Sequence, residues 1–276
     1  MVDLDKTGKV TIQRGNIVAA NRRVSRRPAP GAPSPRVRVL RMRKAPEPRD
    51  WEEAEFVPSP GLETSELERL PLFPLPGAVL FPGTFMPLHI FEPRYRALVK
   101  SALEQRGAMG VVQLRRDPPG GDVPRVHQVT GVGRIAQCQE LPDGRYLILL
   151  AGLARARIVR ECTTDEPFRR FELVLLDETV VPAASAAREL ETLRSCLRPV
   201  AADLTEGGAP LLQAAEHATD PGEFADLLTS VLIDDSSKRQ RLLEMTDAQR
   251  RVNEVVHYLA EVLLEKRKKS GSSALN

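Results

Sequence analysis

The chain has 276 residues, of which 42% are hydrophobic and 28% charged, as is typical of a soluble globular protein with one or two domains. The net charge of +3 hides an asymmetry, because residues 1–50 carry 13 Lys and Arg against 4 Asp and Glu, whereas the rest of the chain carries 27 against 33. The longest apolar run, Tyr146–Ala154, has nine residues, about half of the ~20 that a membrane-spanning helix needs. With no apolar signal-peptide core either, the composition predicts a cytoplasmic protein without a membrane span.

The three cysteines do not form a recognisable redox or metal motif. Cys138, Cys162 and Cys196 are widely spaced, and an odd number argues against a disulfide framework. We interpret them as small buried hydrophobic residues in a reducing compartment.

Residues 1–65 are predicted to form a disordered tail and linker. Between Asn21 and Pro48 the chain consists mainly of Arg, Pro and small residues, which favour an extended, solvated chain. Three interpretations remain open: a passive tail, an electrostatic arm for nucleic acid, or an over-extended gene start. Trp51–Glu68 is acidic and interrupted by proline, as expected of a linker.

Residues 66–182 show short apolar segments separated by turn signals, which favours a β-barrel or curled sheet. The predicted strands are Leu70–Phe73, Thr84–Ile90, Met109–Leu114, Val126–Cys138, Arg145–Leu150, Ala154–Arg160 and Phe168–Thr179. Pro142-Asp143-Gly144-Arg145 is the clearest hairpin signal. A helix is expected to begin at Pro93, with an apolar stripe that includes Leu98 and Leu103.

Residues 183–269 have helical periodicity, and residues 270–276 form a polar tail. Ala184–Arg198 is the first predicted helix, and Asp220 is placed to cap a second one. A short helix around Ser237–Met245 follows, and Thr246 is expected to open the longest helix through a capping box. The predicted fold class is therefore α+β, a β-rich module followed by a helical bundle.

Catalytic motifs are missing from the sequence. There is no phosphate loop of the GxxxxGK[ST] type, no HExxH and no GxSxG, and the four histidines lack metal-ligand spacing. Gly131-Val132-Gly133-Arg134-Ile135-Ala136 matches a dinucleotide fingerprint, but the chain continues as a strand where a helix would be required. We therefore expect these glycines to permit a bulge or a close backbone approach, and we predict no catalytic residue, metal ligand or cofactor.

The segment from Leu70 to Tyr95 resembles the opening of the Lon protease N-terminal domain. Its sequence LPLFPLPGAVLFPGTFMPLHIFEPRY follows that family's pattern of prolines and apolar residues closely. Later segments also resemble the family, including Asp143-Gly144-Arg145, Gly152–Ile158 and Asp220–Leu243. Arg134 departs from the pattern, since the family has a small or hydroxylic residue there.

This resemblance implies a PUA-like pseudobarrel packed against a helical bundle, and a role in recognising unfolded or partly folded polypeptides. The chain stops where the Lon ATPase and Ser-Lys protease would begin, so we expect a non-enzymatic module, such as a quality-control adaptor that serves a separate protease. The candidate polypeptide-binding residues are apolar members of the proline-rich segment: Leu72, Phe73, Leu75, Phe81, Met86 and Tyr95. The alternative is nucleic-acid binding through the basic N-terminal arm.

Overall fold

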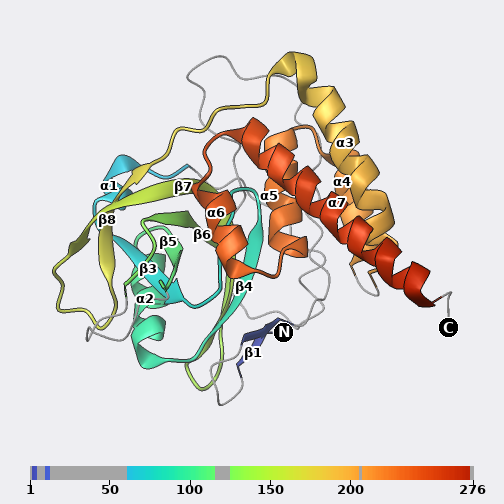
Figure 1. Cartoon of the computed structure of the whole chain (residues 1–276). Helices are drawn as coiled ribbons and strands as arrows, with labels where there is room; N and C mark the ends of the chain where they lie inside the picture. The colour runs from blue at the N-terminus through green and yellow to red at the C-terminus, as the bar shows by residue number, and fades with distance from the viewer. Residues whose placement is uncertain (1, 5–9, 13–60, 116–124, 205–206, 274–276) are drawn as a thin grey trace.

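A computed structural model describes residues 2–4, 10–12, 61–115, 125–204 and 207–273, with side chains of the last helix described as far as residue 265. The β-rich half and the helical half are consecutive in sequence and packed side by side (Figure 1). The predicted α+β class is thus confirmed. Residues 13–60, with most of the predicted tail and the basic arm, lie outside the described residues.

Six strands form the main sheet, and five of them close into a barrel. Their bounds are β3 Leu70–Leu75, β4 Phe85–Ile90, β5 Ala108–Gln113, β6 Val129–Glu140, β7 Tyr146–Cys162 and β8 Arg170–Leu175. The strand order is β4-β7-β6-β5-β3-β8, and β8 pairs back onto β7. The second half of β7 completes the barrel with β8, while the first half extends as a ribbon that pairs with β4.

The two strands predicted at Arg145–Leu150 and Ala154–Arg160 are one continuous strand, β7. It follows β6 through the predicted hairpin, where the Gly144 amide donates to the Leu141 carbonyl and the Leu141 amide donates to the Arg145 carbonyl. The sequence around Gly152 predicted a break between two strands. Instead, β7 continues past Gly152 because its residues on both sides of Gly152 pair with β6.

The GxGxxA sequence lies within β6 and opens no helix. A Cβ atom on Gly131 would stand 1.9 Å from the carbonyl oxygen of Leu80, and one on Gly133 would stand 2.0 Å from that of Ala151. The β6–β7 register also shifts between Val132 and Gly133. The expectation of a close backbone approach and a bulge is therefore confirmed.

The proline-rich strand β3 lies between β5 and β8, but its pairing is uneven. Residues 72–75 pair with β5 in parallel, whereas β8 pairs only with Leu70 and Pro71. Pro74 therefore lies beyond the β8 pairing and costs the sheet no hydrogen bond on that side.

Helices α3 to α7 form a bundle on one side of the barrel, whereas α1 and α2 lie among the strands on its other side (Figure 1). Their bounds are α1 Thr64–Leu67, α2 Pro93–Glu104, α3 Ala183–Ala201, α4 Gly208–His217, α5 Pro221–Leu232, α6 Ser236–Glu244 and α7 Ala248–Ser273. Asp220 caps α5 as predicted, because its carboxylate accepts from the Glu223 amide at 2.9 Å. At α7 the prediction was one residue off: the carboxylate of Asp247, not a Thr246 hydroxyl, accepts from the Arg250 amide. Helix α4 was not predicted.

The segment before the barrel is tied to it by a buried arginine. Arg134 is 1% exposed, donates to Glu66 at 2.6 and 2.9 Å, and also donates to the carbonyls of Gly61 and Arg106. Burial by itself would raise the pKa of Glu66, but the hydrogen bond and charge of Arg134 bring it below its ordinary value. Arg134, the residue that departs from the family pattern, thus anchors residues 61–67, and Leu67 packs into the core beside β8.

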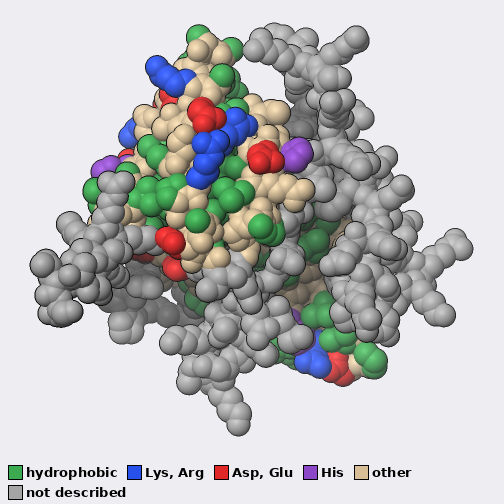
Figure 2. Space-filling view, turned by 90° about the vertical axis from the view of Figure 1, so that its right-hand side faces the viewer, with side chains coloured by type: hydrophobic (Ala, Val, Ile, Leu, Met, Phe, Trp, Pro, Cys, Tyr) green, Lys and Arg blue, Asp and Glu red, His purple; other side chains and the backbone are tan. Residues whose placement is uncertain are grey.

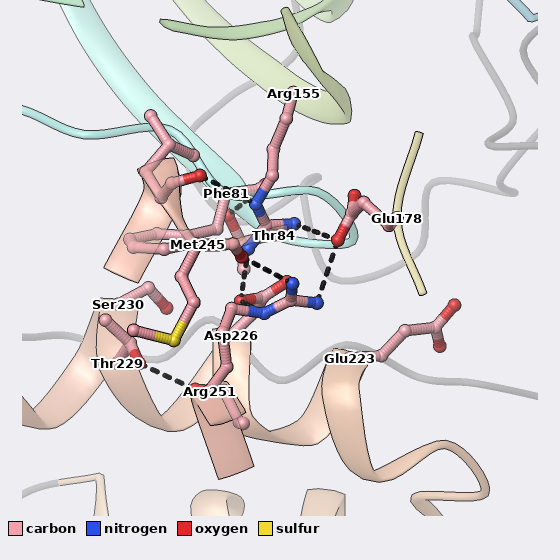
Figure 3. A network of polar contacts seen from close by, with 12 residues as sticks. Phe81, Thr84, Arg155, Glu178, Glu223, Asp226, Thr229, Ser230, Met245 and Arg251 are labelled. Atoms are coloured by element: carbon pink, nitrogen blue, oxygen red, sulfur yellow. Dashed lines mark hydrogen bonds and ion pairs between the residues drawn. The ribbon is translucent and has the colours of Figure 1, made fainter. Parts of the chain in front are cut away.

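A second buried arginine joins the barrel to the helices (Figure 3). Arg155 on β7 is fully buried and bonds Asp226 of α5 at 2.6 Å and Glu178 of the β8–α3 connection at 2.8 Å. Arg251 of α7 reaches the same two carboxylates. Burial opposes the charge, but Asp226 and Glu178 raise the pKa of Arg155 above its ordinary value. Barrel, connection and bundle therefore meet at one charged network.

Candidate polypeptide-binding face

The six residues predicted to bind polypeptides are divided among separate parts of the core. Leu72 and Phe81 are fully buried, Leu72 inside the barrel and Phe81 against the helices. Phe73 and Tyr95 are 6% and 9% exposed, and their ring centroids lie 4.2 Å apart. Leu75 and Met86 are half-buried and pack on the same cluster as Phe73. The four buried side chains cannot reach a ligand in this conformation. Among the six predicted residues, only Leu75 and Met86 are exposed enough to contact one.

The β4–β7 ribbon has two faces of different character. In antiparallel strands, residues directly opposite each other lie on the same face. Met86, Leu88 and Ile90 lie opposite Leu150, Ile148 and Tyr146, and all six pack into or against one hydrophobic cluster. This is the inner face of the ribbon. Because side chains alternate along a strand, the residues between these six lie on the outer face.

The outer face of the ribbon is mainly apolar, although its large side chains belong to none of the three hydrophobic clusters of the described residues. It consists of Phe85, Pro87 and His89 on β4, opposite Ala151, Leu149 and Leu147 on β7. Pro87 is exposed, and Phe85, Leu147 and Leu149 are half-exposed. Phe91, 42% exposed, follows the strand, and its ring meets that of His89 edge-on with centroids 5.9 Å apart. Phe85, Phe91, Leu147 and Leu149 are absent from the three hydrophobic clusters of the described residues.

Strand β4 is also the last strand of the sheet order and pairs, among those six strands, with β7 alone. The Thr84 carbonyl accepts from the Gly152 amide, so backbone groups at alternate positions from Thr84 point toward β7 and those between them point outward. Pro87, which has no amide hydrogen, occupies one of the outward positions. A proline there breaks no pairing with β7 and stiffens the edge.

The surroundings of this face do not favour covalent or metal chemistry. Of the three cysteines predicted to be buried, only Cys162 is; Cys138 is exposed and lies near the end of this face. Desolvation of its thiol and then the charge of Glu140 still raise the pKa of that thiol to about 11, so it stays protonated at neutral pH. No group of His, Cys, Asp or Glu in the described residues is arranged to hold a metal ion. What the face offers is an apolar, shape-fixed strip beside a strand edge.

Positive and negative side chains are mixed on the side of the described surface that Figure 2 shows. There, Lys and Arg side chains stand next to Asp and Glu, with hydrophobic side chains between them. The basic arm on which nucleic-acid binding was predicted to depend lies outside the described residues. In the part of the chain that is described, no helix combines the length and hydropathy needed to cross a bilayer.

Comparison with known proteins decides the family. The sequence model of the ATP-dependent protease La (LON) substrate-binding domain matches residues 69–261, which include the barrel and most of the bundle. The chain belongs to this Lon substrate-binding domain family. It is 32% identical to the Lon protease of Trichlorobacter lovleyi and 30% identical to Lon protease 2 of Myxococcus xanthus, over 200 and 210 residues. Those alignments cover 70% and 72% of this chain, but 24% of each relative.

Solved structures show the same fold. The N-terminal domain of a Mycobacterium avium complex Lon protease superposes with a TM-score of 0.56 at 16% identity, and the Xanthomonas campestris Lon N-terminal domain protein with 0.51 at 22%. Each alignment covers about 70% of this chain and 98% of the other. The barrel and bundle thus have the fold of a Lon N-terminal domain, and this chain spans about a quarter of the length of its Lon relatives.

The residues of this face, Phe85, Pro87, Phe91, Leu147 and Leu149, are not among the six predicted ones. The prediction drew on apolar residues of the proline-rich segment, and apolarity does not show which of them are buried. The sequence contained one usable signal: Pro87 inside a predicted strand indicates a sheet edge. It could not say which alternate residues of β4 face the core, since that depends on what packs against each face.

Proposed function

We propose that this chain binds unfolded or partly folded polypeptides through the outer face of the β4–β7 ribbon, and that it acts by binding alone. The observation that carries the proposal is that this face presents aromatic and aliphatic side chains at a strand edge, and that Phe85, Phe91, Leu147 and Leu149 lie outside the three hydrophobic clusters of the described residues. Membership of a substrate-binding family supports the same role.

An extended client fits the geometry of this face. Side chains of the client would contact Phe85, Leu149 and Leu147, and client backbone would run along β4. Because the β4–β7 pairing and Pro87 hold the face in shape, little ordering entropy is lost on the protein side. None of the six positions of the face is Lys, Arg, Asp or Glu, so recognition would depend on the apolar content of the client and not on its sequence.

As an adaptor, the protein would hold clients for a separate protease. It would bind them without cleaving them, since the six candidate residues and the outer face offer no nucleophile with an activating base.

The test is fluorescence anisotropy of a labelled, permanently unfolded protein titrated with the full chain at physiological salt. Saturable binding is expected. Leu149→Ser should weaken Kd about fivefold, the equivalent of about 1 kcal/mol at an interface contact. The matched control is Val159→Ser, which removes a 55% exposed residue from the far half of the same strand and should leave Kd unchanged.

Equal Kd values for Leu149→Ser and the parent chain would refute the face, and absence of binding to any unfolded chain would refute the function. The labelled client should also keep its full length on electrophoresis after prolonged incubation. Fragments that appear with the pure protein would overturn the proposal of binding alone.

A further inference from the structure

The N-terminal strands form a small sheet of their own. β1 (Val2–Leu4) pairs with β2 (Val10–Ile12) in antiparallel register, with Val2 opposite Ile12 and Leu4 opposite Val10. Opposed and alternate positions of such a pair share a face, so the register collects four aliphatic positions on one face and leaves Asp3 and Thr11 on the other. A two-stranded hairpin is marginally stable alone in water and needs apolar surface to pack on.

This hairpin lies next to strand β4, one of the two strands that form the candidate binding face. Cα atoms of β1 and β4 come within 8 Å of each other, and Figure 1 places β1 beside the lower part of β4. Strand β1 does not join the six-stranded sheet, so it lies beside β4 without extending that sheet. The strand that bears Phe85 and Pro87 therefore has an N-terminal neighbour about 80 positions away in sequence.

The chemistry of the hairpin matches the clients expected for this face. Val2, Leu4, Val10 and Ile12 are aliphatic residues in extended conformation, and an unfolded client would present the same groups. The other end of the N-terminal segment is held in place, because Arg134 bonds both Glu66 and the Gly61 carbonyl. The hairpin and the face belong to one chain, and residues 61–66 of that chain are bonded to the barrel. Any contact between hairpin and face is therefore intramolecular, and its extent does not depend on protein concentration.

We infer that the β1–β2 hairpin is an intramolecular occupant of the outer β4–β7 face and competes there with client polypeptides. This inference rests on the proposed function. When the hairpin occupies the face for part of the time, the apparent Kd for a client equals the intrinsic Kd divided by the fraction of molecules whose face is free. Occupancy of about 90% leaves about a tenth free and so raises the apparent Kd about tenfold. Removing the aliphatic residues of the hairpin then increases client affinity, the opposite of what loss of a binding residue does.

The experiment compares the full chain with the variant Val2→Ser/Leu4→Ser/Val10→Ser/Ile12→Ser. The matched control is Asp3→Asn/Thr11→Ser, which alters the opposite face of the same hairpin. Two quantities are measured: backbone amide hydrogen exchange of Phe85–Ile90 without client, and Kd for the labelled unfolded protein. The four-serine variant is expected to exchange severalfold faster in β4 and to bind the client about tenfold more tightly, and the control to match the parent.

The two readouts separate the inference from the function on which it rests. Unchanged exchange in β4 would overturn docking of the hairpin, whatever the client data show. Faster exchange with an unchanged or weaker Kd would overturn competition. Faster exchange with no client binding by either protein would overturn both the proposed function and the competition, while leaving the hairpin docked on β4. Circular dichroism and the unfolding midpoint should be unchanged, because the barrel and bundle begin at Leu70 and the hairpin forms a separate sheet.

Discussion

The barrel–bundle junction buries charged side chains, whereas the outer β4–β7 face leaves apolar side chains partly exposed. At the junction Arg155, Asp226 and Arg251 are each less than 5% exposed, whereas on the ribbon Phe91 is 42% exposed and Pro87 is open to solvent. Charged groups are buried where the barrel meets the bundle, and apolar groups are partly exposed on the ribbon, which the described helices of the bundle do not cover. The junction therefore holds its charges in buried ion pairs, whereas the ribbon presents apolar side chains outside the hydrophobic clusters of the described residues.

Two arginines on strand β7 also differ in burial according to whether the helices cover them. Arg155 and Arg157 are two positions apart on β7, so their side chains start from the same face. Arg155 is fully buried beneath the helices and lies with its guanidinium carbon 5.8 Å from the centre of the Phe81 ring. Arg157 is exposed. Their different roles come from the helices, not from the strand.

The largest effect is expected from breaking the junction. Arg155→Met leaves Asp226 buried with half of its partners, which should lower the free energy of unfolding by about 3–5 kcal/mol. Arg157→Met is the matched control and should change it by less than about 0.5 kcal/mol. Urea denaturation of both variants measures the difference. If the two variants lose equal stability, the junction is not the main polar support of the fold.

The next largest effect on stability is expected where the loop between β3 and β4, residues 76–84, lies against β6 at Gly131. Gly131→Ala places a Cβ against the Leu80 carbonyl, a backbone atom that cannot rotate away, and should cost about 2–3 kcal/mol. Gly61→Ala adds the same methyl group where no atom lies within 4 Å and where φ is not positive. Thermal unfolding of the two proteins should separate them clearly. A neutral Gly131→Ala would show that the loop is not packed on β6 as described.

A smaller, pH-dependent effect is expected at the Arg134 anchor. Because the folded pKa of Glu66 lies below its ordinary value, the stability that it contributes is present above about pH 4.5 and is lost as pH falls through the folded pKa. In Glu66→Gln the loss of stability on acidification below that pH should be shallower than in the parent chain. Urea midpoints at pH 7, 5 and 3.5 test this. Identical pH profiles would mean that Arg134 does not stabilise the charged form of Glu66.

The smallest effect on stability is expected on the ribbon itself. Phe91→Ser and Leu149→Ser remove residues that belong to no hydrophobic cluster, so each should lower the free energy of unfolding by less than about 1 kcal/mol. Leu98→Ser removes a fully buried residue of α2 and should cost at least about 3 kcal/mol. Parallel denaturation curves measure all three. A large loss in Phe91→Ser would place this face in the core and remove the distinction drawn above.

Much of the fold could be predicted from sequence because its signals are local. The Pro142–Arg145 turn, the Asp220 cap and the start of α2 at Pro93 each depend on a few neighbouring residues. The change from strand spacing to helical spacing at Pro182 likewise predicted a β-rich half and a helical half. The motif from Leu70 to Tyr95 then indicated the Lon substrate-binding family, which comparison confirmed.

What only the tertiary structure decided was which side of each element is covered. Apolarity in the sequence marks Phe81 and Phe85 alike, yet Phe81 packs between barrel and helices and Phe85 lies on the outer ribbon face. Arg155 and Arg157 are chemically identical, yet helices cover only the first. Both distinctions depend on partners far away in the chain, since burial of a side chain is set by what packs against it and not by its own identity.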